Sequence, residues 1–227
     1  MKRIILITFI LMSHLSFSQD WDFEKPNYKK IEENIQNKES NLFYEVLMNR
    51  FQQADSTMTL DEKRHLYYGY IFDENYSPYS RSDYGDSLRV VLRKEKMDSL
   101  DFNKIVDYTT KMLFENPFDL NAINYQLFSL EQLGNEESFE KRAIQLRTIV
   151  DALISSGNGK TKEEAFYVIY TSHEYDLLNI LGFQFGGSQS LTEHYDYLTI
   201  AENEIKLEGL YFDVSPCLNS MSKMFKE

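Results

Sequence analysis

The sequence predicts an α+β protein that is mainly helical, in which a helical region precedes a small C-terminal α+β unit with an antiparallel sheet. Apolar residues recur at helical spacing from residue 26 to about residue 156, and aromatic and β-branched runs follow. The 227 residues, 42% hydrophobic and 15% aromatic, are enough to bury a core. We therefore expect a helical region over residues 19–156 and an α+β region over residues 157–227, docked on the helices.

The first 18 residues have the order of a secretory signal peptide. Lys2 and Arg3 form a positive segment, an apolar run covers residues 4–15, and Ser16 and Ser18 supply small side chains at positions −3 and −1 before Gln19. The apolar run is shorter than the roughly 20 residues that span a bilayer, and no cysteine follows it to carry a lipid. We expect an exported protein of the periplasm, the outer membrane or the extracellular space that is not a lipoprotein and has no integral membrane segment in its mature chain.

The helical region contains several apolar stripes that are bounded by capping signals. Thr59 and Glu62 have the spacing of a capping box, which begins a helix, and Asn116-Pro117 ends another. The predicted helices cover residues 28–35, 42–51, 59–72, 88–92, 102–113, 122–133 and 136–153.

The last three of these helices resemble a tetratricopeptide unit. Asn116-Pro117-Phe118-Asp119 separates the first pair, and Leu133-Gly134-Asn135 separates the second. The pattern covers one unit and does not repeat regularly, so a tetratricopeptide-like array of helical hairpins and a general helical bundle both remain open.

After residue 156 the pattern changes to that of a small sheet with one helix. Gly157-Asn158-Gly159 interrupts the helical spacing, and residues 173–181 form a helical stretch that ends at Gly182. Glu202-Asn203-Glu204 is a candidate hairpin connection. The predicted strands cover residues 165–170, 183–185, 195–200 and 207–214.

Charge and motif content exclude several classes of function. The net charge of −12 and the pI near 4.9 argue against nucleic acid as a partner, because phosphates are bound by Lys and Arg. The single cysteine, Cys217, allows no internal disulfide. The histidines are not at the spacing of a zinc site, and phosphate-loop and Ser-His-Asp hydrolase motifs are missing. We therefore expect no metal and no cofactor.

Short aromatic and glycine-containing motifs are spread over nearly all of the mature chain. They are Asn41-Leu42-Phe43-Tyr44, His65-Leu66-Tyr67-Tyr68-Gly69-Tyr70, Tyr76-Ser77-Pro78-Tyr79, Gly157-Asn158-Gly159-Lys160-Thr161 with Ala165-Phe166, His173-Glu174-Tyr175, Gln189-Ser190-Leu191 and Leu210-Tyr211-Phe212-Asp213-Val214. In these motifs the chain resembles an uncharacterised Bacteroidetes-type family of exported proteins with a domain of unknown function. The resemblance implies an exported location and a fold, and it implies no activity.

The candidate binding residues lie in and before one tyrosine-rich loop. Tyr76, Tyr79, Arg81 and Tyr84 combine rigid aromatic area with a cation, a composition that interfaces favour. His65 lies on the aromatic helix that leads into this loop. A loop that packs back on the helices has the same composition, so both interpretations remain open.

These observations favour an exported cell-envelope protein that is a non-catalytic binding or scaffolding module. Its expected partner is another envelope protein or a glycan. One alternative is a hydrolase that acts on an envelope polymer or glycan, which would need carboxylates or histidines that converge in a pocket. The other is a structural subunit of an oligomer, which would expose an apolar face.

Overall fold

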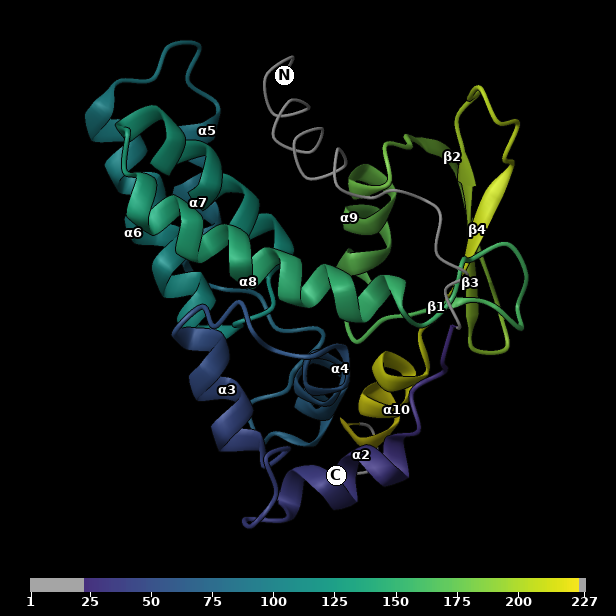
Figure 1. Cartoon of the computed structure of the whole chain (residues 1–227). Coiled ribbons are helices and arrows are strands. Elements are labelled where there is room, and N and C mark those ends of the chain that lie inside the picture. Colours follow the sequence, from purple (N-terminus) through teal and green to yellow (C-terminus); the bar gives the residue numbers. More distant parts are fainter. Residues whose placement is uncertain (1–22, 225–227) are drawn as a thin grey trace. The chain divides into compact units, whose positions relative to one another are not determined.

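The computed structural model of the chain describes residues 23–224 (Figure 1). The α+β, mainly helical class is confirmed: helices dominate, and a four-stranded sheet lies near the C-terminal end of the sequence. The chain forms two compact units, a helical unit of Pro26–Ala152 and a sheet unit of the described residues 23–25 and 153–224. The predicted signal peptide lies outside the described residues. In residues 23–224 no helix combines the length and the apolar character that crossing a membrane requires.

The helical unit contains every helix that the spacing predicts. The elements are α2 (Tyr28–Gln36), α3 (Tyr44–Gln52), α4 (Leu60–Gly69), the 3₁₀ turn η1 (Tyr70–Phe72), α5 (Tyr84–Leu92), α6 (Ser99–Glu115), α7 (Leu120–Leu133) and α8 (Glu136–Ile154), whose last two residues belong to the sheet unit.

Local sequence determines where several of these helices begin and end. The predicted capping box is present: the Thr59 side chain accepts the Glu62 N–H, and the Glu62 carboxylate accepts the Thr59 N–H. The side chain of Asp119 accepts the Ala122 N–H at the start of α7. Gly134, with a φ of 66°, ends α7 in the left-handed conformation that glycine adopts without strain.

The core of the helical unit is largely aromatic. Tyr67, Tyr68 and Phe118 are almost completely buried, and the Tyr67 and Phe118 rings meet edge to face with centroids 5.9 Å apart. The Tyr68 hydroxyl donates to the Ala152 carbonyl, so this buried phenol is hydrogen-bonded. α6 and α7 pack side by side (Figure 1). A chain without a disulfide is thus stabilised by aromatic burial.

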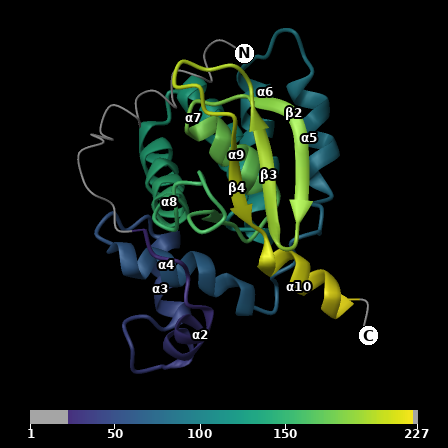
Figure 2. The ribbon, with the colours of Figure 1, turned by 90° about the vertical axis from the view of Figure 1, so that its right-hand side faces the viewer.

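The sheet unit is a mixed four-stranded sheet with two helices. Its elements are β1 (Phe166–Tyr167), α9 (Ser172–Ile180), β2 (Phe185–Thr192), β3 (Tyr195–Ile200), β4 (Gly209–Asp213) and α10 (Ser215–Met224). The strand order is β1-β4-β3-β2, with β1 parallel to β4 and the other pairs antiparallel. Figure 2 shows β2, β3 and β4 side by side.

Two strand predictions differ from the structure. Only Phe166–Tyr167 of residues 165–170 forms a strand, because its parallel partner β4 ends at Asp213 opposite Tyr167. The strand expected at residues 183–185 is instead β2, which extends to Thr192. The sheet is therefore mixed rather than purely antiparallel, and its outer antiparallel strand is longer than the sequence predicts.

Candidate functional site

The predicted binding loop is ordered by a turn and by aromatic contacts at both of its ends. The Ser80 N–H and hydroxyl both donate to the Ser77 carbonyl, 3.2 and 2.9 Å away, across a turn that contains Pro78. The Tyr76 ring meets the Tyr70 ring edge to face with centroids 5.9 Å apart. The half-buried Tyr76 therefore holds the start of the loop to the aromatic core.

The other end of the loop is held by Tyr84, the first residue of α5. Its ring stacks on the Tyr108 ring of α6, at 6.4 Å between centroids and 23° between planes. The Lys111 ammonium lies 5.1 Å from the centroid of the Tyr84 ring and forms an ion pair with Asp107 at 2.7 Å. The hydrogen bond that Lys111 donates to Asp107 raises the pKa of Lys111. The two anchors leave Tyr79 (38% exposed) and the exposed Arg81 between them.

His65, the fifth predicted residue, lies inside the helical unit. Its Nδ1 is 2.8 Å from the Asp61 carbonyl, and its Nε2 is 3.0 Å from the side-chain nitrogen of Asn34. A tautomer that donates from Nδ1 and accepts at Nε2 satisfies both contacts. Because His65 is buried and both nitrogens are engaged, its contacts are those of a structural residue.

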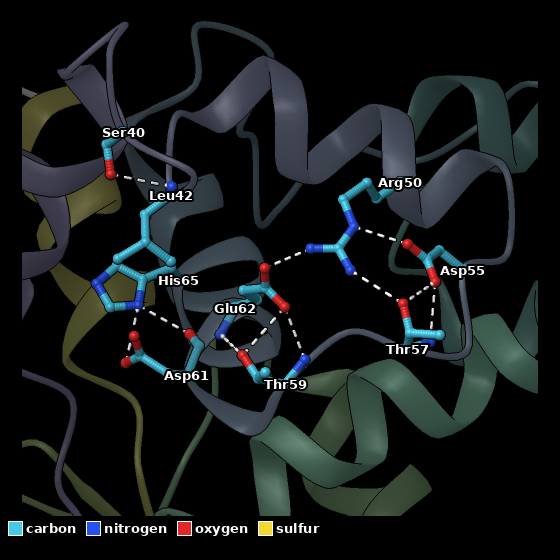
Figure 3. Close-up of polar contacts among 9 residues, drawn as sticks. All are labelled: Ser40, Leu42, Arg50, Asp55, Thr57, Thr59, Asp61, Glu62 and His65. Atoms are coloured by element: carbon cyan, nitrogen blue, oxygen red, sulfur yellow. Dashed lines mark hydrogen bonds and ion pairs between the residues drawn. The ribbon is translucent and has the colours of Figure 1, made fainter.

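Arg50 lies at the centre of a polar cluster of the helical unit (Figure 3). Its guanidinium contacts Asp55 at 2.7 Å, Thr57 at 3.3 Å and Glu62. Hydrogen bonds from Thr57 and Arg50 lower the pKa of Asp55 to about 2. Burial alone would raise the pKa of Glu62, but hydrogen bonds from Thr59 and Arg50 lower it. The cluster ties the end of α3 to the capping box of α4, so we assign it a structural role.

In the sheet unit, Glu174 of α9 is a buried acid beside a second acid. Its side chain is fully buried, and no donor in the described part of the chain reaches either carboxyl oxygen. Burial and the charge of Asp196 on β3 raise the pKa of Glu174 to about 9. Glu174 is therefore protonated at neutral pH, and its proton is available for a hydrogen bond to Asp196.

Hydrogen bonds continue from this acid pair to the sheet edge. The side-chain nitrogen of Gln189 on β2 donates to Asp196 at 2.8 Å, and the Tyr175 hydroxyl donates to the side-chain oxygen of Gln189. Burial raises the pKa of Tyr175, as do the neighbouring acids. The chain of contacts joins α9 to β2 and β3, but Glu174 itself is out of reach of a substrate.

A second cluster, at the end of β4, pairs a partly exposed imidazole with a buried carboxylate. His194 Nε2 lies 3.4 Å from Asp213 Oδ2, and the imidazole side chain is 43% exposed. The Ser215 N–H and hydroxyl both donate to the other carboxylate oxygen. Burial and the charge of Asp213 raise the pKa of Tyr167. A carboxylate behind an imidazole is how a general base is oriented, but Ser215 donates to Asp213 rather than to His194, so no Ser-His-Asp triad is formed.

Neither polar cluster of the sheet unit is visible in the sequence alone. Strand pairing and the packing of α9 bring Asp196 and Gln189 close to Glu174. Strand pairing also brings His194 close to Asp213. The sequence does show polar residues within predicted strands, but this pattern does not indicate which residues they contact. Over residues 23–224, the structure contains no group of three or more His, Cys, Asp or Glu side chains arranged to hold a metal.

Fold and clusters together define a mainly helical α+β protein with an ordered aromatic loop on one unit and buried acids in the other. Comparison with family models shows that the chain belongs to the family described as a domain of unknown function (DUF4919), whose model matches residues 29–223. No curated protein and no solved structure is similar enough to match the chain.

Proposed function

We propose that the protein is exported to the cell envelope and acts there as a non-catalytic binding module, with the loop from Tyr76 to Tyr84 as its contact surface. The order of residues 1–18 supports export, because it is that of a signal peptide. The composition of the loop supports binding, since Tyr and Arg are the side chains on which interfaces most depend.

The observation that carries this proposal is how the loop is held. Tyr76 and Tyr84 anchor its ends on Tyr70 and Tyr108, and between these anchors Tyr79 and Arg81 are exposed. A loop that is ordered before it meets a partner loses less conformational entropy on binding. An aromatic ring and a guanidinium in such a loop can contact an apolar or sugar face and a carboxylate together.

The expected partner is another envelope protein or a glycan rather than a nucleic acid. The chain has a net charge of −12, which repels phosphate backbones. The exposed Arg81 would pair with a carboxylate of the partner, and Tyr79 would stack on a sugar ring or an apolar side chain.

The experiment is affinity capture from envelope extract with the tagged protein, followed by mass spectrometry of bound proteins and glycans. We expect the double variant Tyr79→Ala/Arg81→Ala to lose the captured partner while its melting temperature stays close to that of the wild type. The matched control is Phe114→Ala/Arg93→Ala, which removes an exposed aromatic residue and an exposed arginine from α6 and the end of α5. Equal capture by both variants would refute a binding role for the loop.

Export is tested separately, by N-terminal sequencing of the protein isolated from its native cells. We expect the mature chain to begin at or near Gln19, because small residues precede it in the order that signal peptidases cleave. A cytoplasmic product that begins at Met1 would contradict export and would leave the binding proposal to be decided by the capture experiment.

A hydrolase of envelope glycans is the second candidate, and the His194–Asp213 pair favours it. The buried carboxylate orients a partly exposed imidazole, as a general base requires. The test is release of soluble fragments from envelope glycan by the wild type and by His194→Gln. A hydrolase predicts release that the variant abolishes without a change in melting temperature, whereas a binding module predicts no release by either protein.

A further inference from the structure

β2 is an open edge of the sheet. Within residues 23–224, in the order β1-β4-β3-β2, it has β3 on one side only, and all eight of its residues, Phe185–Thr192, are exposed. At about 3.3 Å per residue the strand is about 26 Å long. A sheet edge presents a row of main-chain donors and acceptors with which another extended chain can pair.

The register identifies which main-chain groups point outward. The Ile200 N–H donates to the main-chain carbonyl of Glu208, and the Val214 N–H donates to that of His194. The main-chain groups of the even-numbered residues of β3 therefore bond to β4. Because the bonding direction alternates along a strand, Tyr195 and Tyr197 bond to β2 instead.

Tyr197 is paired with Ser190, and Tyr195 is paired with Thr192. The N–H and C=O groups of Ser190 and Thr192 therefore face β3. The main-chain groups of Gln189 and Leu191 face outward, and they have no hydrogen-bonded partner in the described part of the chain.

This edge lacks most of the features that keep natural sheet edges from pairing. Its sequence, FGGSQSLT, contains no charged residue and no proline, in a chain that is 26% charged. The register shift between Phe185 and Gln189 interrupts one end of the strand. The regular part, from Gln189 to Thr192, is left open.

The edge is also fixed in place before any partner arrives. The Gln189 side chain donates to Asp196 on β3 and accepts from the Tyr175 hydroxyl on α9. The Thr199 hydroxyl accepts the Ser188 N–H and donates to the Ser188 carbonyl, at 3.0 Å in each case. A strand held in this way has already lost the freedom that binding would otherwise have to remove.

We propose that β2 binds an extended peptide segment of a partner protein by strand addition, through the main-chain N–H and C=O groups of Gln189 and Leu191. Strand addition derives affinity from main-chain hydrogen bonds and specificity from alternate side chains. This site goes beyond the proposed function, because the aromatic loop belongs to the other unit and uses side chains.

Charge favours a peptide over a second copy of the chain. Two copies would repel each other, because each has a net charge of −12. The exposed Glu202 and Glu204 directly follow β3. They lie close to the start of β2, since the Ala201 N–H donates to the Gln184 carbonyl at 2.8 Å. The segment that fits is uncharged where it meets Gln189 and Leu191 and basic at the end that lies beside these glutamates.

Proline substitution separates the open side of β2 from its paired side. Leu191→Pro removes an outward N–H and leaves the bonds to β3 intact, so we expect it to fold with a melting temperature close to that of the wild type. Ser190→Pro removes a bond to Tyr197, so we expect a clearly lower melting temperature. Leu191→Ala removes the leucine side chain but keeps its N–H, and it is the matched control for binding.

The probe is a phage-displayed library of random dodecapeptides, selected on the purified wild-type protein. We expect the selected peptides to bind Leu191→Pro at least tenfold more weakly than Leu191→Ala. In the wild type, they should slow hydrogen exchange of the Gln189 and Leu191 amides. Selected peptides with alternate N-methylated amides should also bind the wild type at least tenfold more weakly, and this measurement needs no protein variant.

Three results would overturn the proposal. The first is that the library yields no peptide above background, or only peptides that bind Leu191→Pro as well as Leu191→Ala. The second is that Leu191→Pro unfolds while Ser190→Pro does not, which would reverse the assigned bonding direction. The third is a wild-type dimer in sedimentation that Leu191→Pro converts to monomer, because the occupant of the edge would then be a second copy.

Discussion

Replacing Glu174 by glutamine should stabilise the protein at neutral and alkaline pH. Burial and Asp196 hold the pKa of Glu174 at about 9 in the folded protein, against 4.5 for an ordinary glutamate. Between these values the folded chain keeps a proton that the unfolded chain releases. The contribution of Glu174 to stability is therefore fully present below pH 4.5 and is lost progressively as the pH rises to about 9.

The magnitude follows from the width of that interval. Each pH unit between the two pKa values shifts the free energy of unfolding by about 1.4 kcal/mol. From pH 4.5 to pH 7 the ionisation of this side chain thus lowers the free energy of unfolding by about 3 kcal/mol. This is a large part of the roughly 5–15 kcal/mol by which a domain is stable. Glutamine does not ionise, and its amide can donate to Asp196 as the protonated acid does.

The assay is urea unfolding followed by circular dichroism at several values between pH 5 and pH 8, for the wild type and Glu174→Gln. We expect the difference in unfolding free energy to grow by about 4 kcal/mol in favour of the variant across this range. Comparison across pH cancels any constant effect of the substitution on packing. The control is Glu204→Gln at an exposed position of the same unit, whose stability should follow that of the wild type in parallel.

Parallel curves for Glu174→Gln and the wild type would refute this reasoning. They would mean that Glu174 is ionised in the folded protein at neutral pH and that a cation or donor compensates its charge. If the parallel curve of the variant also lies lower by a constant amount, the carboxyl contributes to packing as well.

Three other predictions concern stability and are measured by urea or thermal unfolding. Leu66→Ala should destabilise the protein by about 2–5 kcal/mol, since Leu66 is fully buried in the aromatic core, and an unchanged melting temperature would contradict its place there. Thr59→Ala should lower stability by about 1 kcal/mol through loss of the capping box, and no loss would show that the cap is dispensable. Gly157→Ala should be strongly destabilising, because its Cβ would lie 2.3 Å from the Glu164 carbonyl oxygen. The Cβ of Gly85→Ala meets nothing within 4 Å, so this substitution should stabilise α5 by roughly 0.5–1 kcal/mol. Equal effects of the two substitutions on stability would refute this argument.

The helices could be predicted because their determinants are local. Ile31 and Ile35 are buried on one face of α2, as their spacing requires. Thr59 and Glu62 are three residues apart and cap each other, and Gly134 ends α7 in a left-handed conformation. Each of these signals acts within a few residues, so the sequence contains both members of every interaction side by side.

The outer strand could not be predicted, because pairing rather than propensity makes it. Gly186, Gly187 and Ser188 have little tendency to form strands. They lie in the register shift of β2, where Gly187 has a φ of 95° and the Thr199 hydroxyl holds Ser188, and the regular pairing with β3 begins only at Gln189. The loop is a mixed case: its composition indicated a contact surface, but its two anchors, on Tyr70 and Tyr108, became visible only in the fold.

The buried acid and the open strand are two ends of one hydrogen-bonded chain. The proton on Glu174 lets a second carboxylate, Asp196, remain close by without repulsion. The Asp196 carboxylate accepts from Gln189, which holds the regular part of β2 against β3 and α9. While it is protonated, Glu174 thus also helps to fix the strand whose free edge faces solvent. Its ionisation as the pH rises weakens the protein. Local stability and the proposed peptide site depend on the same side chains, so a substitution at Gln189 would disturb both, whereas the Leu191 substitutions act on the edge alone.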